Sequence, residues 1–258
     1  MNKASGRKTG RGRFFIDILY EDQWLSVIYK PAGLLTVPYP GSREKTALDI
    51  LNEIRRKRGL VRGERGTFAV HRLDKETSGV LMIAHSKEAA DRIMNSWHTM
   101  VTQRLYRALT ENSSIMDTIP GSGIIDAPLA KNAYNRSFAV EKDQGKALSN
   151  KGLQNKTYGK KSTETEAVQA KTAYTILKRG KKYSLFELEL DTGRKNQIRA
   201  HLAYLGCPIA GDTNYRAKTD PEHRLCLHAR TLSFTHPFTG ENLSFEIGED
   251  ASWEKYLN

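Results

Sequence analysis

The segment 71–79, His-Arg-Leu-Asp-Lys-Glu-Thr-Ser-Gly, holds the residues of this chain that are best suited to chemistry. It places one carboxylate, Asp74, in a polar stretch that favours turns, two residues after Arg72. The apolar runs 67–70 and 80–84 on either side both predict strands. Loops that such a scaffold holds in place are common sites of catalysis. Taken alone, the same residues also fit a turn capped by Asp74 beside a solvated Arg72.

This segment resembles the active-site motif of the RluA-type pseudouridine synthases, His-Arg-Leu-Asp-x-x-Thr-Ser-Gly. The resemblance implies that uridine within RNA is isomerised: the bond between N1 and C1′ breaks, the uracil turns, and C5 bonds to C1′. It identifies Asp74 as the indispensable catalytic residue. Whether the carboxylate attacks the sugar, attacks the ring or assists elimination stays open. Such a reaction needs no redox cofactor and no phosphoryl donor, in agreement with a sequence without a dinucleotide fingerprint or a P-loop.

Residues 192–202 are similar to a second family segment, Thr-Gly-Arg-x-His-Gln-Ile-Arg-x-His-Leu. The match implies that Arg199 pairs with Asp74 and keeps this carboxylate ionised. It also suggests Arg194 and Gln197 as substrate-binding residues. The chain departs from the pattern at Asn196, where the family most often has histidine. Because asparagine can still form hydrogen bonds, we expect the contacts around the active-site residues to differ in detail while the activity is retained.

Residues 104–108 resemble the family's Lys-x-Tyr-x-Ala strand, with Arg104 in place of the lysine. The resemblance implies that Tyr106 stacks on the target base and takes part in proton transfer; alone, a strand tyrosine would indicate packing. It further implies that Arg72 extracts the nucleotide from its stack, with a phosphate contact as the alternative. We assign His71 and His228 to packing or hydrogen bonding.

The composition favours a polyanionic partner. Of the 258 residues, 41 are Lys or Arg and 29 are Asp or Glu, which gives a net charge of +12. The basic residues cluster at 1–13, 55–65 and 151–182. RNA or DNA is therefore the expected partner, and the release of counterions on phosphate contact would supply much of the affinity. Two cysteines and seven histidines show no ligand spacing, and we expect no metal and no cofactor. Without an apolar run of membrane length, the chain is expected to be cytoplasmic, and a monomer is expected because nothing in the sequence suggests a dimer seam.

Helices are expected from Thr46, from Ser86 and over residues 194–205, since apolar side chains recur there at helical spacing. The first has a capping box between Thr46 and Asp49. The buried face of the second includes Met94, and Gly206 ends the third.

Strands are expected at residues 26–29, 103–109, 171–178, 183–190, 224–234 and 242–247. Many strands and few helices predict an α+β fold with a mixed or antiparallel sheet as its core and flanking helices. We expect a flexible basic arm over residues 1–13 and one pseudouridine synthase domain over residues 14–258. A polar insertion at 141–168 interrupts this domain, and no separate N-terminal RNA-binding domain is expected.

Three functions are compatible with these features of the sequence. The first is an RNA pseudouridine synthase with ribosomal RNA as its favoured substrate and transfer RNA as the close alternative. The second is a protein of the same fold that has lost catalysis and acts as an RNA chaperone, which would tolerate loss of Asp74. The third is a metal-dependent nuclease, against which the lack of a second clustered acid counts. The combination of Asp74, Tyr106 and Arg199 favours the first.

Overall fold

The computed structural model describes residues 14–61, 66–140 and 166–258. They form two compact units. Unit 1 comprises the described residues up to Arg107 together with Leu227–Ala251, and unit 2 comprises those of Ala108–Cys226 together with Ser252–Asn258. The predicted arm at 1–13 and all but the end of the predicted insertion lie outside the described residues.

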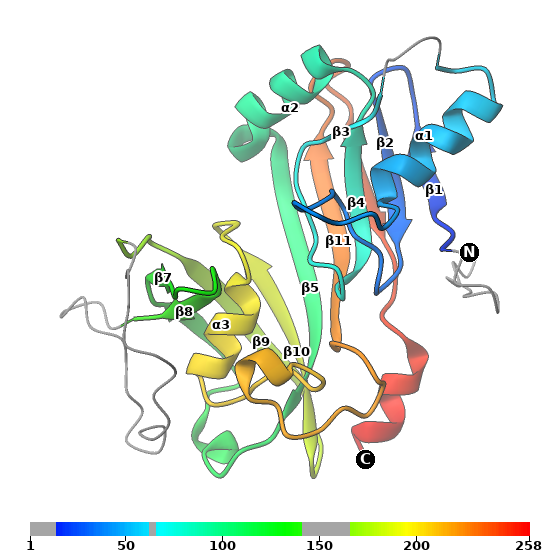
Figure 1. Ribbon diagram of the computed structural model, residues 1–258. Coiled ribbons are helices and arrows are strands. Elements are labelled where there is room, and N and C mark those ends of the chain that lie inside the picture. The colour runs from blue at the N-terminus through cyan, green and yellow to red at the C-terminus, as the bar shows by residue number, and fades with distance from the viewer. Residues whose placement is uncertain (1–13, 62–65, 141–165) are drawn as a thin grey trace. The chain divides into compact units, whose positions relative to one another are not determined.

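Unit 1 is built from a sheet and two long helices (Figure 1). Its elements are β1 Asp17–Glu21, β2 Leu25–Lys30, α1 Ala47–Lys57, β3 Phe68–Ala69, β4 Ser78–Ala84, α2 Lys87–Met100, the first part of β5 Val101–Glu111, β11 Leu227–Thr235 and β12 Asn242–Glu246. The strand order is β1-β2-β4-β11-β5, with β3 beside β4 and β12 beside β11. β11 runs parallel to β4, whereas β2 and β3 run antiparallel to it.

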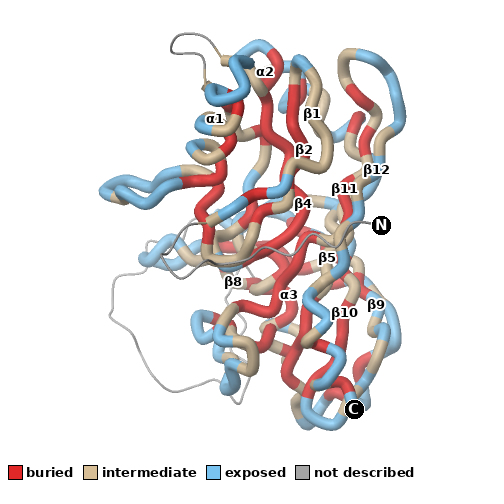
Figure 2. The backbone as a smooth tube through the Cα atoms, turned by 90° about the vertical axis from the view of Figure 1, so that its right-hand side faces the viewer, coloured by how far each residue is buried: buried red, intermediate tan, exposed pale blue. Residues whose placement is uncertain are grey.

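The strand β4 is buried along its whole length, as Figure 2 shows. Its side chains alternate between two hydrophobic clusters because successive residues of a strand point to opposite faces. Val80 and Met82 join the cluster that contains residues of α2, and Leu81 and Ile83 join the cluster that contains residues of α1. The strand that follows segment 71–79 is therefore covered on both faces.

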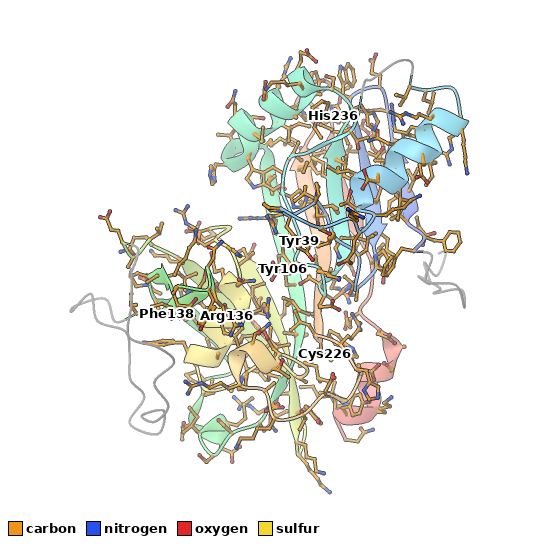
Figure 3. The ribbon with its side chains drawn as sticks, in the orientation of Figure 1. Tyr39, Tyr106, Arg136, Phe138, Cys226 and His236 are labelled. Carbon is orange, nitrogen blue, oxygen red and sulfur yellow. The ribbon has the colours of Figure 1, made fainter. Side chains whose placement is uncertain are left out.

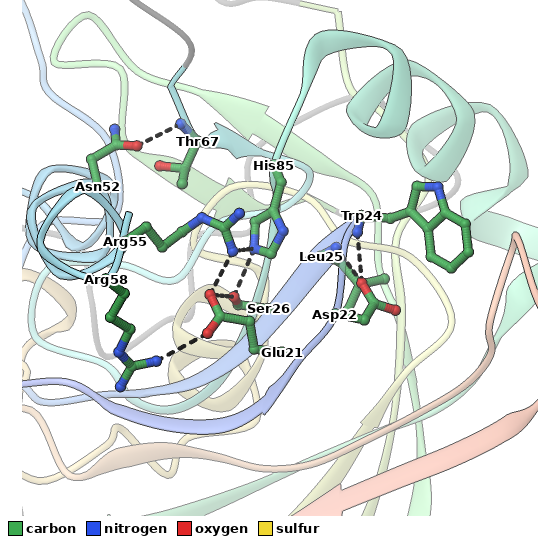
Figure 4. A network of polar contacts seen from close by, with 10 residues as sticks. All are labelled: Glu21, Asp22, Trp24, Leu25, Ser26, Asn52, Arg55, Arg58, Thr67 and His85. Carbon is green, nitrogen blue, oxygen red and sulfur yellow. Dashed lines mark hydrogen bonds and ion pairs between the residues drawn. The ribbon is translucent and has the colours of Figure 1, made fainter. Parts of the chain in front are cut away.

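The predicted capping box of α1 is confirmed. The amide of Asp49 donates to Thr46 Oγ1 at 3.2 Å, and the amide of Thr46 donates to Asp49 Oδ2 at 2.8 Å. In the last turn of the helix, the buried guanidinium of Arg55 donates to Glu21 Oε1 of β1 at 2.5 Å and contacts His85 Nε2 at 2.8 Å (Figure 4). This network fastens α1 to the sheet.

Helix α2 begins after Ser86, as predicted, and Ser86 Oγ accepts from the amide of Ala89 at 3.1 Å. The prediction that Met94 faces the core is wrong, since this side chain is 46% exposed. The buried stripe is centred on Ile93, and the next residue is turned by about 100° away from it.

Unit 2 contains a second set of strands and one α-helix. Its elements are the last part of β5, η1 Met116–Thr118, β6 Ser122–Asp126, β7 Leu129–Lys131, β8 Ser137–Ala139, β9 Lys171–Arg179, β10 Tyr183–Leu190, α3 Gln197–Tyr204, η2 Thr213–Tyr215 and most of η3 Ala251–Tyr256. The strand order is β5-β10-β9-β6, and β7 pairs with β8. The predicted β9–β10 hairpin is confirmed, and Phe186 and Leu188 are fully buried on one face.

The third helix starts later than predicted. Residue 194 was the expected start, but α3 begins at Gln197 because Asn196 has a left-handed backbone with φ of 55°. Its end agrees with the predicted stop, since Gly206 has φ of 84°.

The predicted α+β class is confirmed: antiparallel pairs and the parallel pair of β4 with β11 form a mixed sheet core with a few helices. None of the described helices is long and apolar enough to cross a membrane.

Gly79 of β4 lies directly against the backbone of β11. It has φ of 126° and pairs with Ala229, and a Cβ at residue 79 would overlap the backbone of Ala229. We expect Gly79→Ala to lower the free energy of unfolding by roughly 3 kcal/mol, because overpacking and a positive φ both oppose alanine.

Urea unfolding followed by circular dichroism measures this change. The control is Gly121→Ala, where a Cβ meets no atom within 4 Å and the expected change is within about 0.5 kcal/mol. Equal changes in the two variants would refute the packing role of Gly79.

Candidate active site

Asp74 follows a residue whose peptide groups are fixed on both sides. The amide of Leu73 donates to Thr36 Oγ1 at 3.2 Å, and the hydroxyl of Thr36 donates to the carbonyl of Leu73 at 2.9 Å. The Leu73 side chain is buried in the cluster that contains residues of α1. After Asp74, its own carbonyl accepts from the amide of Thr77 at 3.1 Å. The partly buried Asp74 is thus held on a defined turn.

A buried lysine supports the other side of this turn. The ammonium of Lys30, which has no exposed surface, donates to the carbonyls of Pro31, Leu34 and Lys75 at 3.0, 2.7 and 3.0 Å. The amide of Gly33 also donates to the carbonyl of Lys75, at 2.8 Å. Burying an ammonium is costly unless its donors are satisfied, so Lys30 ties the turn after β2 to the residue that follows Asp74.

His71 anchors the start of the segment as a neutral ring. Its Nε2 accepts a hydrogen bond from the amide of Met82 at 2.9 Å, and the ring lies 4.8 Å from that of Trp97. Burial, together with the charge of Arg104, lowers the pKa of His71 from 6.5 to about 3. A protonated ring would lose its acceptor, so the observed bond requires the neutral form.

His228 of β11 holds the end of the segment. Its Nε2 lies 2.9 Å from the carbonyl of Ile247, and its Nδ1 lies 2.9 Å from Ser78 Oγ. Because a carbonyl only accepts, the proton is on Nε2, and Nδ1 accepts from the serine hydroxyl. The prediction that His71 and His228 serve packing and hydrogen bonding is confirmed.

Tyr106 is the predicted site residue of unit 1 that lies within electrostatic range of Asp74. It lies on β5, is partly buried, and packs against the cluster that contains Leu73 and Leu81 (Figure 3). Burial raises the pKa of Tyr106, and the nearby charge of Asp74 raises it further, while Arg104 opposes them. The phenol therefore keeps its proton beside the carboxylate at neutral pH. Arg72 is exposed in the loop that carries Asp74.

In unit 2, the amide of Gln197 is used within the protein. Its Oε1 accepts from the hydroxyl of Thr192 at 2.8 Å and from the amide of Arg194 at 3.0 Å. Its Nε2 donates to the carbonyl of Lys171 at 2.8 Å and to Thr172 Oγ1 at 3.0 Å. Gln197 is 2% exposed, so this side chain holds the turn before α3, whereas Arg194 is exposed on that turn.

Two buried residues that sequence reasoning did not identify complete this network. His201 Nε2 lies 2.9 Å from the carbonyl of Ala127, and His201 Nδ1 lies 2.8 Å from Thr172 Oγ1. Burial lowers the pKa of His201, and the neutral ring donates to the carbonyl and accepts from the threonine hydroxyl. The hydroxyl of Thr172 is then free to accept from Gln197.

Arg199 forms a fork-like pair with Asp212. Its Nε donates to Asp212 Oδ2 at 2.7 Å, and a terminal nitrogen donates to Oδ1 at 2.8 Å. Asp212 is 2% exposed, and the guanidinium lies 5.0 Å from the centre of the Tyr215 ring. Two parallel bonds and an aromatic face fix the orientation of this cation. Sequence reasoning missed Asp212, whose one signal is a carboxylate that follows the apolar run 207–210 and Gly211.

The six predicted site residues fall into two sets. Arg72, Asp74 and Tyr106 belong to unit 1, and Arg194, Gln197 and Arg199 belong to unit 2. Within unit 1 a carboxylate on a fixed loop lies within electrostatic range of a protonated phenol on β5, a combination suited to nucleophilic attack and proton transfer. Within unit 2 a cation is held by a buried carboxylate.

Comparisons with known proteins agree with one another. A family model described as RNA pseudouridylate synthase matches residues 24–204. The chain is 33% identical to an "uncharacterized RNA pseudouridine synthase" of Bacillus subtilis, over 90% of this chain and 68% of that protein. It is 33% identical to tRNA pseudouridine synthase C of Salmonella typhi, over 94% and 88% of the two chains.

Two further similarities extend this result. Ribosomal large subunit pseudouridine synthase D of Pseudomonas aeruginosa is 29% identical, over 92% of this chain and 70% of that protein. The solved structure of human RNA pseudouridylate synthase domain containing 4 has a TM-score of 0.68 and 26% identity, over 93% and 91% of the two chains.

The low pKa of His71 links stability to pH. Between pH 6.5 and about 3 the unfolded chain binds a proton at His71 that the folded chain does not, so stability falls as the pH falls. From pH 7 to pH 5 this group alone contributes a loss of about 2 kcal/mol. The side-chain amide of His71→Gln can still accept from the amide of Met82. In this variant, the difference in the free energy of unfolding between pH 7 and pH 5 should shrink by that amount.

Urea unfolding at pH 7 and at pH 5 gives this difference in the free energy of unfolding for the wild type and for the variant. His98→Gln is the matched control, since His98 is exposed on α2. A pH dependence of His71→Gln that equals that of the wild type would contradict the assignment.

Proposed function

The chain belongs to the RNA pseudouridylate synthase family and isomerises uridine in RNA, and we propose that Asp74 is the catalytic carboxylate of this reaction. The observation that carries the proposal is the fixed turn around Asp74. Thr36 and Lys30 hold the peptide groups of the neighbouring residues, so the carboxylate needs little reorganisation when the nucleotide arrives.

Tyr106 is proposed as the wall on which the detached uracil rests. A ring beside the carboxylate gives the base a face to stack on while the bond between N1 and C1′ is open. Because the phenol keeps its proton, it can also donate to the base or return a proton to it. The raised pKa of Tyr106 supports this role.

Arg199 is proposed as the cation that keeps Asp74 ionised, as the motif resemblance implies. Support comes from its bidentate pair with Asp212, which would present a guanidinium of fixed orientation. Arg72 and Arg194, both exposed, are proposed to bind the RNA. Gln197 is proposed to act indirectly by holding the turn that carries Arg194, because its amide is already fully used.

Ribosomal RNA is the proposed first substrate, and transfer RNA the second. Both appear in the names of relatives, as ribosomal large subunit pseudouridine synthase D and tRNA pseudouridine synthase C. We further propose that the protein acts as a cytoplasmic monomer without a cofactor. Its net charge of +12 supports binding to structured RNA through phosphate contacts.

Loss of the carboxylate tests the proposed role of Asp74. Transcripts of large-subunit ribosomal RNA and of transfer RNA, labelled with tritium at uridine C5, should release tritium with the wild type. In Asp74→Ala the release should fall by at least about 10³-fold, since no other group replaces the carboxylate.

RNA binding by Asp74→Ala, measured by filter retention, should stay close to that of the wild type. Glu76→Ala removes an exposed carboxylate from the same loop and should release tritium like the wild type. Full activity of Asp74→Ala would remove it from the mechanism, and binding without release by the wild type would favour the chaperone alternative.

The pair of Arg199 and Asp212 yields a second prediction. Asp212→Asn keeps the volume of the side chain but removes the charge that orients Arg199. We expect kcat to fall by at least about tenfold while KM for the transcript changes by less than about twofold, because orientation and not binding is lost.

The matched control is Glu249→Gln, which weakens the pair between Arg230 and Glu249 at 2.5 Å in unit 1. Its kcat should equal that of the wild type. Should Asp212→Asn raise KM and leave kcat intact, Arg199 would instead be a binding residue.

A further inference from the structure

An exposed tyrosine stands on the loop between β2 and α1. Tyr39 is 53% exposed, although aromatic side chains are usually covered in proteins. It follows Pro38 and precedes Pro40, which are also exposed. The loop leaves the core at the buried Thr36 and returns where the amide of Ala47 donates to the carbonyl of Leu35 at 2.7 Å.

The backbone around Tyr39 is already ordered. The amide of Ser42 donates to the carbonyl of Tyr39 at 3.0 Å, and Gly41 has φ of 84°. Proline at the second position and a glycine with positive φ at the third are the features of a type II turn. Since the two prolines fix their own φ angles, the ring is presented on a stiff support, and less conformational entropy is lost when a ligand binds.

The same loop is fastened to the segment that carries Asp74. The hydroxyl of Thr36 donates to the carbonyl of Leu73 and accepts from its amide. Glu44 Oε2 accepts from the ammonium of Lys75 at 2.7 Å. Glu44, and to a smaller extent Tyr39, raise the pKa of Lys75, so the phenol lies within electrostatic range of the residue after Asp74. Tyr39 and Tyr106 both belong to unit 1 (Figure 3).

We propose that Tyr39 is a stacking platform for a base that neighbours the target uridine in the RNA. A nucleotide that leaves its stack exposes the faces of its neighbours, and an aromatic ring replaces the lost contact whatever the base is. The exposed Arg43 in the same loop suits the adjoining phosphate. This inference rests on the proposed function of Asp74 and names a substrate-binding residue beyond it.

Steady-state kinetics on the tritium-labelled transcripts give the first test. Tyr39→Ala should raise KM by about tenfold, within the range of about 5- to 150-fold expected for one stacked base, with a smaller change in kcat. Tyr39→Leu keeps apolar bulk without an aromatic face and should behave like the alanine variant. Tyr39→Phe keeps the aromatic ring and should raise KM far less.

Met94→Ala is the matched control, because Met94 is another exposed apolar side chain of unit 1. It should leave KM unchanged. An unchanged KM in Tyr39→Ala, or an equal loss in Tyr39→Phe and Tyr39→Ala, would overturn the proposal.

Fluorescence provides a test that does not need turnover. Tyr39→Trp in the Asp74→Ala background is titrated with the unlabelled transcripts, and the Asp74→Ala protein gives the signal of the three native tryptophans. Stacking should quench the added tryptophan as RNA binds. Binding without added quenching would refute stacking even if the wild type releases tritium. Quenching in this variant, together with no tritium release by the wild type, would sustain the platform and refute the proposed reaction.

Discussion

The backbone contact between Gly79 and Ala229 is the constraint on which unit 1 depends. It allows β11 to run parallel to β4 at the point where segment 71–79 becomes a strand. It also sets Ser78 opposite His228, whose ring is bonded to Ile247. Thr36 and Lys30 hold the turn around Asp74, and the pairing of Ser78 and Gly79 with β11 fixes the end of the same segment. The last residues of the motif are thus structural.

Patterns of neighbouring residues were sufficient to predict much of the fold. The capping box of α1 and the alternation in β10 were confirmed because each depends on residues within a few positions. The segment around Asp74 was recognisable for the same reason, since its groups lie within nine consecutive positions. Its partners Thr36 and Lys30 come from elsewhere in the chain and could not be read from the motif.

What the sequence did not reveal depends on distant contacts or on backbone angles. Asp212 pairs with Arg199 only after the chain has turned back beyond α3. The start of α3 was misplaced because an asparagine that adopts a left-handed angle looks like any polar residue before a helix. Met94 shows a further cause: apolar spacing defines a stripe, but not which residue at its edge is covered.

The hydrogen bonds of Lys75 explain a feature of the motif itself. Its carbonyl accepts from both Lys30 and Gly33, whereas its side chain points to a partly exposed ion pair with Glu44. The main-chain bonds that hold the turn at this position therefore do not depend on which side chain the residue carries, and the side chain adds only the ion pair to Glu44. The two undefined positions between the aspartate and the threonine are consequently open to change in charge or size. Surface properties next to the reacting nucleotide can diverge there without disturbing the carboxylate.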